Sequence, residues 1–260
     1  MNHLFTNTTF QFDSKKSTDF NLYLVNLETG VKNVPYSVER EINEEKIRNN
    51  SIPYFFGINE QPLYFKVTLF REEEWDYDTR IEITRWLFQD EYKPFISTDN
   101  NSIIYNCIIV DRPEKLLIGN ITRMIELNFR CDAPWAWSPS FSTTYDLSDN
   151  TTTKTLQFEN RSNIVKYCYP EIWIQSLDGG AISLKNYSDG GREFKFNNLQ
   201  INETIYVNNQ LKQIETDIPN IYRLSDFVGR NWLRLNYGIN QIVVTGKCLI
   251  KTQMQYPIAI

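Results

Sequence analysis

Hydrophobic and polar positions alternate along most of the first half of the chain, which is the pattern of half-buried strands. The clearest run is residues 63–70, in which Phe65, Val67 and Leu69 fall on one side. Similar runs occupy residues 10–12, 22–27, 32–40, 103–110 and 121–129. We therefore expect a strand framework in this half.

One segment breaks the alternation. Residues 78–88 place apolar side chains at helical spacing, and Thr79 and Glu82 stand three residues apart, as in a capping box. Asp76 and Asp78 add negative charge where the N–H groups of a helix start are unpaired. We predict one short helix packed on the strands through Ile83, Trp86 and Leu87.

The segment from Ala133 to Pro139 is the predicted domain boundary, because its two prolines interrupt any strand ladder. Residues 1–139 hold 15 Lys+Arg against 21 Asp+Glu, a net −6, whereas residues 140–260 hold 12 against 11, a net +1. Short alternating runs between turn signals follow, such as those at Asp178-Gly179-Gly180 and Asp189-Gly190-Gly191. We predict a mainly β protein of two domains, 1–139 and 140–260, the second an antiparallel sandwich or jelly roll.

Composition narrows the class of protein. No run approaches 18 apolar residues and no secretory signal is visible, so we expect synthesis in a cytoplasm without membrane insertion. The four cysteines are scattered, which favours buried free thiols over bridges or metal ligands. No basic stripe is present, so specific nucleic-acid binding is not expected.

Candidates for catalysis are few. The only histidine is His3, which excludes most His-based nucleophile pairs and zinc sites. The acidic run 72–78 admits a Ca²⁺ site or a carboxylate pair for glycoside hydrolysis, but a solvated loop with a helix cap explains it more simply. Asp178 and Asp189 each precede Gly-Gly, which indicates turns rather than acid/base residues. We expect that the protein is not an enzyme and that it binds no cofactor and no metal. A hydrolase that uses a pair of carboxylates is the remaining enzymatic alternative.

Two segments are candidate contact surfaces. Residues 39–48 mix charges densely, which fits either an exposed loop or an arm whose charges set register against a neighbouring subunit. Aromatic residues of the second half could form a platform for sugar stacking or belong to the core. Trp173 lies in an apolar run and is assigned to the core, whereas Trp232 and Tyr237 stay possible sugar or partner contacts.

Several fragments, in this order, resemble the distal tail protein family of long-tailed bacteriophages. They are Phe10-Gln11-Phe12 with Phe20-Asn21-Leu22, Glu39-Arg40-Glu41-Ile42, Arg85-Trp86-Leu87-Phe88, Ile104-Tyr105-Asn106-Cys107, residues 128–137 and Leu235-Asn236-Tyr237-Gly238-Ile239-Asn240-Gln241-Ile242. Each fragment alone is weak, but the ordered set covers nearly the whole chain.

The resemblance implies a β-sandwich N-terminal domain with a single short helix that assembles as a homo-hexamer. It also implies a C-terminal β-sandwich similar to galectins and carbohydrate-binding modules. Members of this family are structural virion proteins of the tail tip, and their ring has a central channel for DNA. It joins the tail tube protein to the tail-associated lysin or adhesin and other baseplate parts, and in some phages to a receptor-binding protein. The implied location is the virion, after synthesis in the bacterial host cytoplasm.

Within this interpretation, residues 39–60 are predicted to form an inter-subunit arm, hereafter the arm. Its aromatic residues would anchor and its charges would orient the contact; the candidate residues are Glu44, Glu45, Arg48, Tyr54, Phe55 and Phe56. The alternative function is a carbohydrate-binding module for host attachment in residues 140–260.

Overall fold

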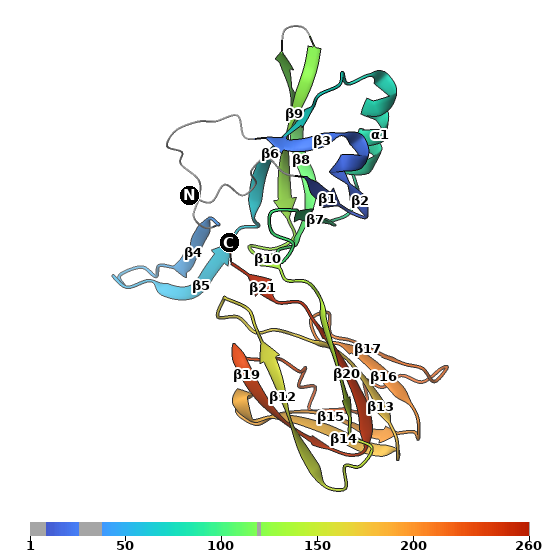
Figure 1. Cartoon of the computed structure of the whole chain (residues 1–260). Helices are drawn as coiled ribbons and strands as arrows, with labels where there is room; N and C mark the ends of the chain where they lie inside the picture. Colours follow the sequence, from blue (N-terminus) through green and yellow to red (C-terminus); the bar gives the residue numbers. More distant parts are fainter. Residues whose placement is uncertain (1–8, 26–37, 119–120, 260) are drawn as a thin grey trace. The chain divides into compact units, whose positions relative to one another are not determined.

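The computed structural model describes residues 9–25, 38–118 and 121–259 of the 260-residue chain. The last two residues of the expected strand 22–27 and most of the expected strand 32–40 lie outside these ranges. The chain divides into two compact units (Figure 1). The first contains the chain up to Ser138 together with Ile258 and Ala259, and the second runs from Pro139 to Pro257.

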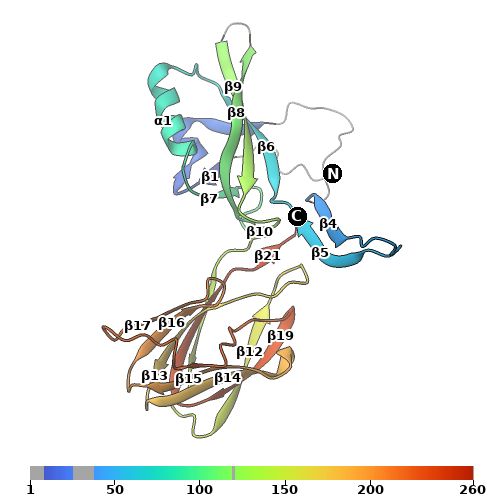
Figure 2. The same ribbon diagram turned by 180° about the vertical axis from the view of Figure 1, so that it is seen from behind.

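The first unit is built on one seven-stranded sheet. Its strand order is β2 (Lys15–Lys16), β1 (Phe10–Phe12), β7 (Lys93–Ser97), β8 (Tyr105–Ile118), β9 (Ile121–Cys131), β6 (Tyr64–Arg71) and β3 (Leu22–Val25). A short 3₁₀ helix, η1 (Ser17–Phe20), connects β2 to β3. The β8–β9 hairpin contains the longest strands and is clearest from behind (Figure 2).

The sheet bends so strongly that strands far apart in its order face each other. Phe12 on β1 and Phe129 on β9 have two strands between them, yet their ring centroids are 5.8 Å apart. Phe65 on β6 and Phe95 on β7 are likewise separated by two strands and lie 5.5 Å apart. The interior is therefore a cluster of stacked and edge-on aromatic rings, and one continuous sheet encloses a core as a two-layered sandwich would.

The predicted helix is α1 (Tyr77–Leu87), the one α-helix in the described part of the chain. Its cap is Asp76 rather than Thr79, because the Asp76 carboxylate accepts from the Thr79 N–H at 2.9 Å. Trp86 is buried; its indole N–H donates to the Phe12 carbonyl at 2.8 Å and its ring stacks on Phe20. The Arg-Trp-Leu-Phe fragment thus holds the helix against the sheet through its tryptophan.

The second unit is a sandwich of two five-stranded antiparallel sheets. One has the order β11 (Phe141–Asp146), β20 (Cys248–Met254), β13 (Glu171–Ser176), β16 (Thr204–Asn208) and β17 (Gln213–Thr216). The other has the order β12 (Thr153–Asn160), β19 (Gly238–Thr245), β14 (Gly180–Asn186), β15 (Arg192–Leu199) and β18 (Phe227–Val228). The 3₁₀ helix η2 (Tyr187–Asp189) links β14 to β15. Apolar residues of both sheets form one core, including Ile172, Ile205, Phe158, Phe194 and Ile242.

The chain passes between the units twice. After β10 (Ala136–Trp137) it enters the second unit, and at its end β21 (Pro257–Ile258) pairs with β10. The first and last strands of the second unit, β11 and β20, are paired in register, with Phe141 opposite Met254. The mainly β class with one helix is confirmed, and the return of the chain at Ile258 is a feature that the sequence did not predict.

Candidate assembly interface

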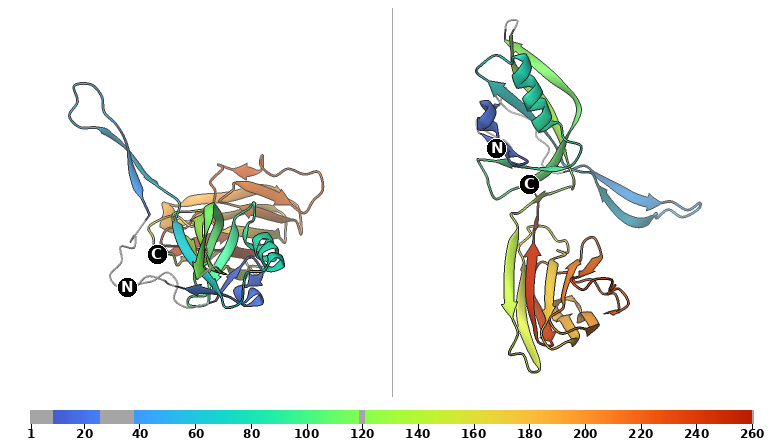
Figure 3. Two further views of the ribbon diagram at one scale, coloured as in Figure 1. Left: turned by 90° about the horizontal axis from the view of Figure 1, so that it is seen from above. Right: turned by 90° about the vertical axis from the view of Figure 1, so that its right-hand side faces the viewer.

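The arm is a two-stranded hairpin of β4 (Arg40–Glu45) and β5 (Tyr54–Glu60) that extends from the first unit (Figure 3). It forms a sheet of its own, separate from the seven-stranded sheet. At its base the Gln61 N–H donates to the Glu39 carbonyl at 3.0 Å. An isolated hairpin is marginally stable in water, so this one needs a further surface to hold it.

Apolar side chains of the arm are exposed. Phe55 and Phe56 each leave 63% of their surface open to solvent, and Ile52 at the tip leaves 74%. Others with large exposed areas are Ile42, Ile47, Tyr54 and Ile58. Contiguous exposed apolar surface of this kind marks protein contact sites, whereas single exposed residues do not.

A β-bulge brings three apolar residues of the arm onto one face, beside Glu44. Ile42 lies opposite Ile58, Glu44 lies opposite Phe55, and the register shifts between these pairs. Residues 42 and 44 of one strand share a face, as do directly opposed residues, so Ile42, Ile58 and Phe55 lie together. In a regular strand without a bulge, residues 55 and 58 would point to opposite faces because they are three positions apart. Gly57, at φ +138°, takes up the distorted backbone.

The charged candidates of the arm are exposed as well. Glu44 and Glu45 lie on β4, and Arg48 lies in the loop toward the tip. Arg40 Nε is 3.6 Å from Glu60 Oε1 near the base of the hairpin, where Arg40 is exposed and Glu60 is half-buried. Sequence reasoning missed Ile42 and Ile58, although their spacing from Phe55 becomes informative once a bulge is allowed.

The other proposed contact residues, Trp232 and Tyr237, are placed differently from each other. Trp232 is half-buried against the core, edge-on to Phe227 at 5.0 Å, whereas Tyr237 is 63% exposed. The shallow depression beside Trp232 has no room even for a water molecule, and Tyr237 does not line it. Small-molecule sites usually enclose about 300 Å³ or more. The two residues are not brought together around one cavity.

Trp173, which the sequence assigned to the core, lies on the outer face of its sheet. The neighbouring isoleucines of β13 point inward, so the alternation of the strand places Trp173 outward. Its ring lies 4.9 Å from that of Tyr206, and Lys251 Nζ lies 4.7 Å from its centroid. The Tyr206 hydroxyl donates to Glu171 at 3.0 Å. The core assignment was wrong because an apolar run does not reveal which face each residue occupies.

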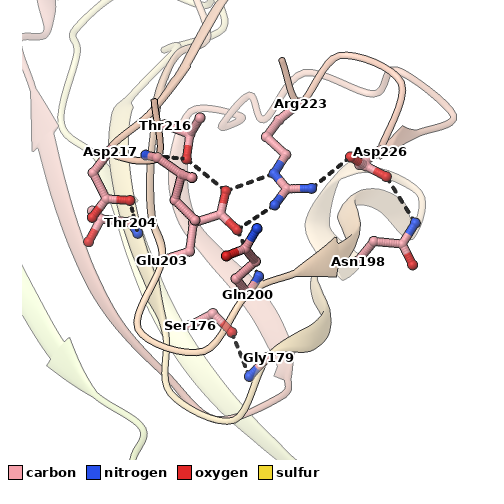
Figure 4. A network of polar contacts seen from close by, with 11 residues as sticks. Ser176, Gly179, Asn198, Gln200, Glu203, Thr204, Thr216, Asp217, Arg223 and Asp226 are labelled. Carbon is pink, nitrogen blue, oxygen red and sulfur yellow. Dashed lines mark hydrogen bonds and ion pairs between the residues drawn. The ribbon is translucent and has the colours of Figure 1, made fainter. Parts of the chain in front are cut away.

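A buried charge network holds two loops of the second unit (Figure 4). Arg223 donates through Nε and Nη2 to the two oxygens of Glu203, each at 2.7 Å, and through Nη1 to Asp226 at 3.0 Å. Glu203 also accepts from Thr216 Oγ1 and the Gln200 N–H. These bonds join residues of the turn at Glu203 to the loop of Arg223 and Asp226, so the network fixes the conformation of both.

The acidic candidates have structural partners. Asp76 caps α1, and its hydrogen bonds with the Thr79 backbone and side chain lower the pKa of its carboxyl. Asp178 pairs with Lys247 at 3.0 Å, and Asp189 pairs with Arg234 at 2.8 Å. Within the described ranges, no group of three or more His, Cys, Asp or Glu side chains is arranged to hold a metal ion. No helix there is long and apolar enough to cross a membrane.

Comparisons with known proteins identify the relatives of this chain. Residues 5–133 match a family model described as a phage tail protein N-terminal domain, and residues 135–254 match a phage tail C-terminal domain. The SPbeta prophage-derived uncharacterized protein YomH of Bacillus subtilis (strain 168) is 24% identical over 249 residues, 95% of this chain and 96% of that protein. The crystal structure of the SPP1 Dit protein, described as a paradigm of the hub adsorption apparatus, aligns with a TM-score of 0.69.

The chain belongs to the phage tail protein family whose N- and C-terminal domain models it matches. The SPP1 Dit alignment covers 96% of this chain and all of that one at 16% identity, so it establishes a shared fold across both units. As a member of this family, the chain is a mainly β component of a phage tail. The aromatic and tryptophan fragments that carried the resemblance serve chiefly as core residues, whereas the Glu39–Ile42 fragment opens the arm.

Proposed function

We propose that this chain is a distal tail protein that forms a hexameric ring at the tail tip, in which the arm of each subunit binds its neighbour. The observation that carries the proposal is the exposed group of Ile42, Ile58 and Phe55 on a hairpin whose strands, among the described residues, pair only with each other. A heterologous contact uses two different patches of each subunit and closes into a ring when the rotation permits.

The chemistry of the arm fits such a contact. Phenylalanine and tyrosine side chains bury large areas, and truncating a few central anchors typically removes most of the affinity of an interface. The charges of Glu44, Glu45 and Arg48 flank these anchors. Charged residues at the rim of an interface act mainly on orientation and association rate. Phe55 and Ile58 therefore supply the affinity and the charged residues supply the register.

Loss of the apolar face tests the arm. Phe55→Ser with Ile58→Ser should convert the oligomer to a folded monomer in size-exclusion chromatography with light scattering. Tyr222→Ser, at an exposed tyrosine of the second unit, is the control and should leave the oligomer intact. Oligomers of undiminished stability after the double substitution would show that the arm is not the subunit contact, but they would not contradict the ring.

The ring itself is tested separately by negative-stain microscopy of the wild-type protein. Six-fold particles with a central hole are expected. A wild-type chain that stays monomeric across a concentration series, with no ring in assembled tails, would contradict the hub proposal. In the assembled tail we place the ring between the tail tube protein and the tail-associated lysin or adhesin, in contact with further baseplate parts.

The charge balance supports a channel for DNA. The net −6 of residues 1–139 disfavours attraction of duplex phosphates to the ring-forming unit, so DNA can pass without binding. The purified protein should leave a duplex DNA probe unretarded in gel electrophoresis even at low salt. Retardation that disappears with added salt would reveal a basic surface and count against a repelling channel.

Saccharide attachment is a second candidate function, favoured by the Trp173–Tyr206 ring pair on the outer face of the second unit. Glu171 and Lys251 beside the rings supply hydrogen-bonding groups that sugar hydroxyls require. In a host cell-wall pull-down, Trp173→Ala should abolish retention while Tyr237→Ala preserves it. Equal retention of both variants would remove this face from consideration, and no retention of the wild type would remove the function.

A further inference from the structure

Two cysteines of the first unit lie directly opposite each other. Cys107 on β8 pairs in register with Cys131 on β9, and both side chains are fully buried in the aromatic core. Since opposed residues of an antiparallel pair share a face, the two thiols extend to the same side of the sheet. Both are free thiols in this structure.

The backbone hydrogen bonds identify the type of this pair. The Asp132 N–H donates to the Asn106 carbonyl at 2.9 Å, one position outside the cysteines, while the Cys131 N–H turns to Leu63 on the other side at 2.8 Å. Cys107 and Cys131 are thus a non-hydrogen-bonded pair, for which the Cα atoms lie about 4.5 Å apart. A disulfide requires about 4.4 to 6.8 Å between Cα atoms, so this backbone can accept one without rearrangement.

The remaining cysteines have no such partner. Cys168 forms an isolated bridge with Leu235, and Cys248 lies opposite Ser176. The chain therefore contains one geometrically matched pair and an internal control. The opposition of Cys107 and Cys131 does not depend on the proposed ring or arm.

We propose that Cys107 and Cys131 are a site of oxidative modification that closes to a cross-strand disulfide when the protein meets a small peroxide oxidant. One thiolate attacks hydrogen peroxide to give a sulfenic acid, and hydroxide leaves and takes up a proton as water. The second thiol then attacks the sulfenic sulfur and a second water leaves. Both S–H bonds are replaced by one S–S bond, and the peroxide is reduced to two waters.

Burial makes the closure slow in the native state. It raises the pKa of Cys131 to about 12, and the nearby Asp132 adds to this rise. Burial also raises the pKa of Cys107, and the neighbouring Cys131 adds to that rise. The thiolate is the reactive form, so few molecules react at neutral pH unless the strands open locally. The pair stays reduced in a cytoplasm and closes with time in an oxidising exterior. The bond then joins two central strands of the first unit.

The test compares variants of the full chain. The variant with Cys168→Ser and Cys248→Ser retains only the matched pair, and the one with Cys107→Ser and Cys131→Ser retains only the control cysteines. Both are treated with hydrogen peroxide, quenched, unfolded and alkylated, and circular dichroism first establishes that each is folded. Cys107→Ala and Cys131→Ala single variants replace the second protein if it does not fold.

The first variant should lose both thiols together, with a mass lower by two hydrogens and a Cys107–Cys131 peptide in a non-reducing digest. Alkaline pH or mild urea should accelerate the loss, and a thiol reductant should reverse it. The control cysteines should remain alkylatable, and each single variant should form no intramolecular bridge. Persistence of both thiols after exposure in mild urea, oxidation to sulfinic acid, or a bridge between molecules would overturn the proposal.

Discussion

Arg223 and Glu203 meet end to end inside the second unit, with two guanidinium nitrogens each donating to a separate carboxylate oxygen at 2.7 Å. The Glu203 side chain has no exposed surface and that of Arg223 has 7%. Buried charges are tolerated only when paired, so each residue makes the other necessary.

Removal of the arginine alone should therefore be costly. Arg223→Met should lower the free energy of unfolding by about 3 kcal/mol or more, because it leaves the Glu203 carboxylate buried without its cation. The double variant with Glu203→Gln should recover most of this loss. Lys247→Met, which breaks the more exposed pair with Asp178, is the control and should cost under about 1 kcal/mol. Urea unfolding followed by circular dichroism measures all three, and equal losses for Arg223→Met and Lys247→Met would contradict the network's role.

Acid should weaken the same network. Although burial alone would raise it, the pKa of Glu203 is held below its ordinary 4.5 by hydrogen bonds, the largest contribution coming from Arg223. The pKa of Asp226 is lowered chiefly by Asn198 and then Arg223. A carboxyl with a depressed folded-state pKa contributes stability that is complete above its unfolded pKa and is lost as the pH falls through the folded value.

The stability advantage of the wild type over Glu203→Gln should consequently be constant above about pH 5.5 and shrink steadily below about pH 4.5. Urea midpoints measured across this range give the comparison. An advantage that is unchanged at pH 3 would show that the Glu203 charge does not contribute to folding.

The indole N–H of Trp86 should matter apart from the packing of its ring. Trp86→Phe preserves an aromatic ring beside Phe10 and Phe20 but removes the donor to the Phe12 carbonyl, so we expect a loss of about 1 kcal/mol or more. Trp86→Ala also removes the ring and should cost about 3 to 5 kcal/mol. Unfolding monitored by the remaining tryptophans measures both. A Trp86→Phe variant as stable as the wild type would show that the indole N–H contributes nothing apart from the ring.

Two glycines of the second unit offer a matched pair of substitutions. Gly246 has φ +102°, and an added Cβ would stand 3.0 Å from the Ala181 carbonyl oxygen. Gly238 has φ +85° with no atom within 4 Å of that position. Both alanine variants are strained, but Gly246→Ala should be the more destabilising by about 1 kcal/mol or more because it adds a steric clash to the strain. The thermal unfolding midpoints of the two variants measure this difference in stability. Equal midpoints would contradict the predicted clash at Gly246.

Local hydrophobic periodicity predicted many of the strands and the helix. Residues 63–70 alternate as one strand face requires, and the helix predicted at residues 78–88 lies at Tyr77–Leu87. Its cap was misassigned because Asp76 and Thr79 both have suitable spacing, and only the backbone geometry determines which carboxylate or hydroxyl faces the first N–H groups. Sequence spacing cannot rank two overlapping caps.

Long-range relations could not be predicted in the same way. The apolar face of the arm depends on a bulge that shifts Phe55 onto the side of Ile42, and such an insertion leaves no mark in hydrophobic periodicity. The opposition of Cys107 and Cys131 depends on the register of two strands, which separation along the chain does not determine. The strands were therefore predictable, whereas their register and the surfaces that follow from it were not.

The second unit begins and ends on paired strands, with Phe141 opposite Met254. A stretch of chain whose two ends are neighbours can be excised and replaced without stretching the remainder. The second unit is in this sense a cassette set into the first, which keeps β10 and β21 on either side of the insertion. Tail proteins of this design can exchange the whole second unit, between Ser138 and Ile258, while the first unit is inherited intact.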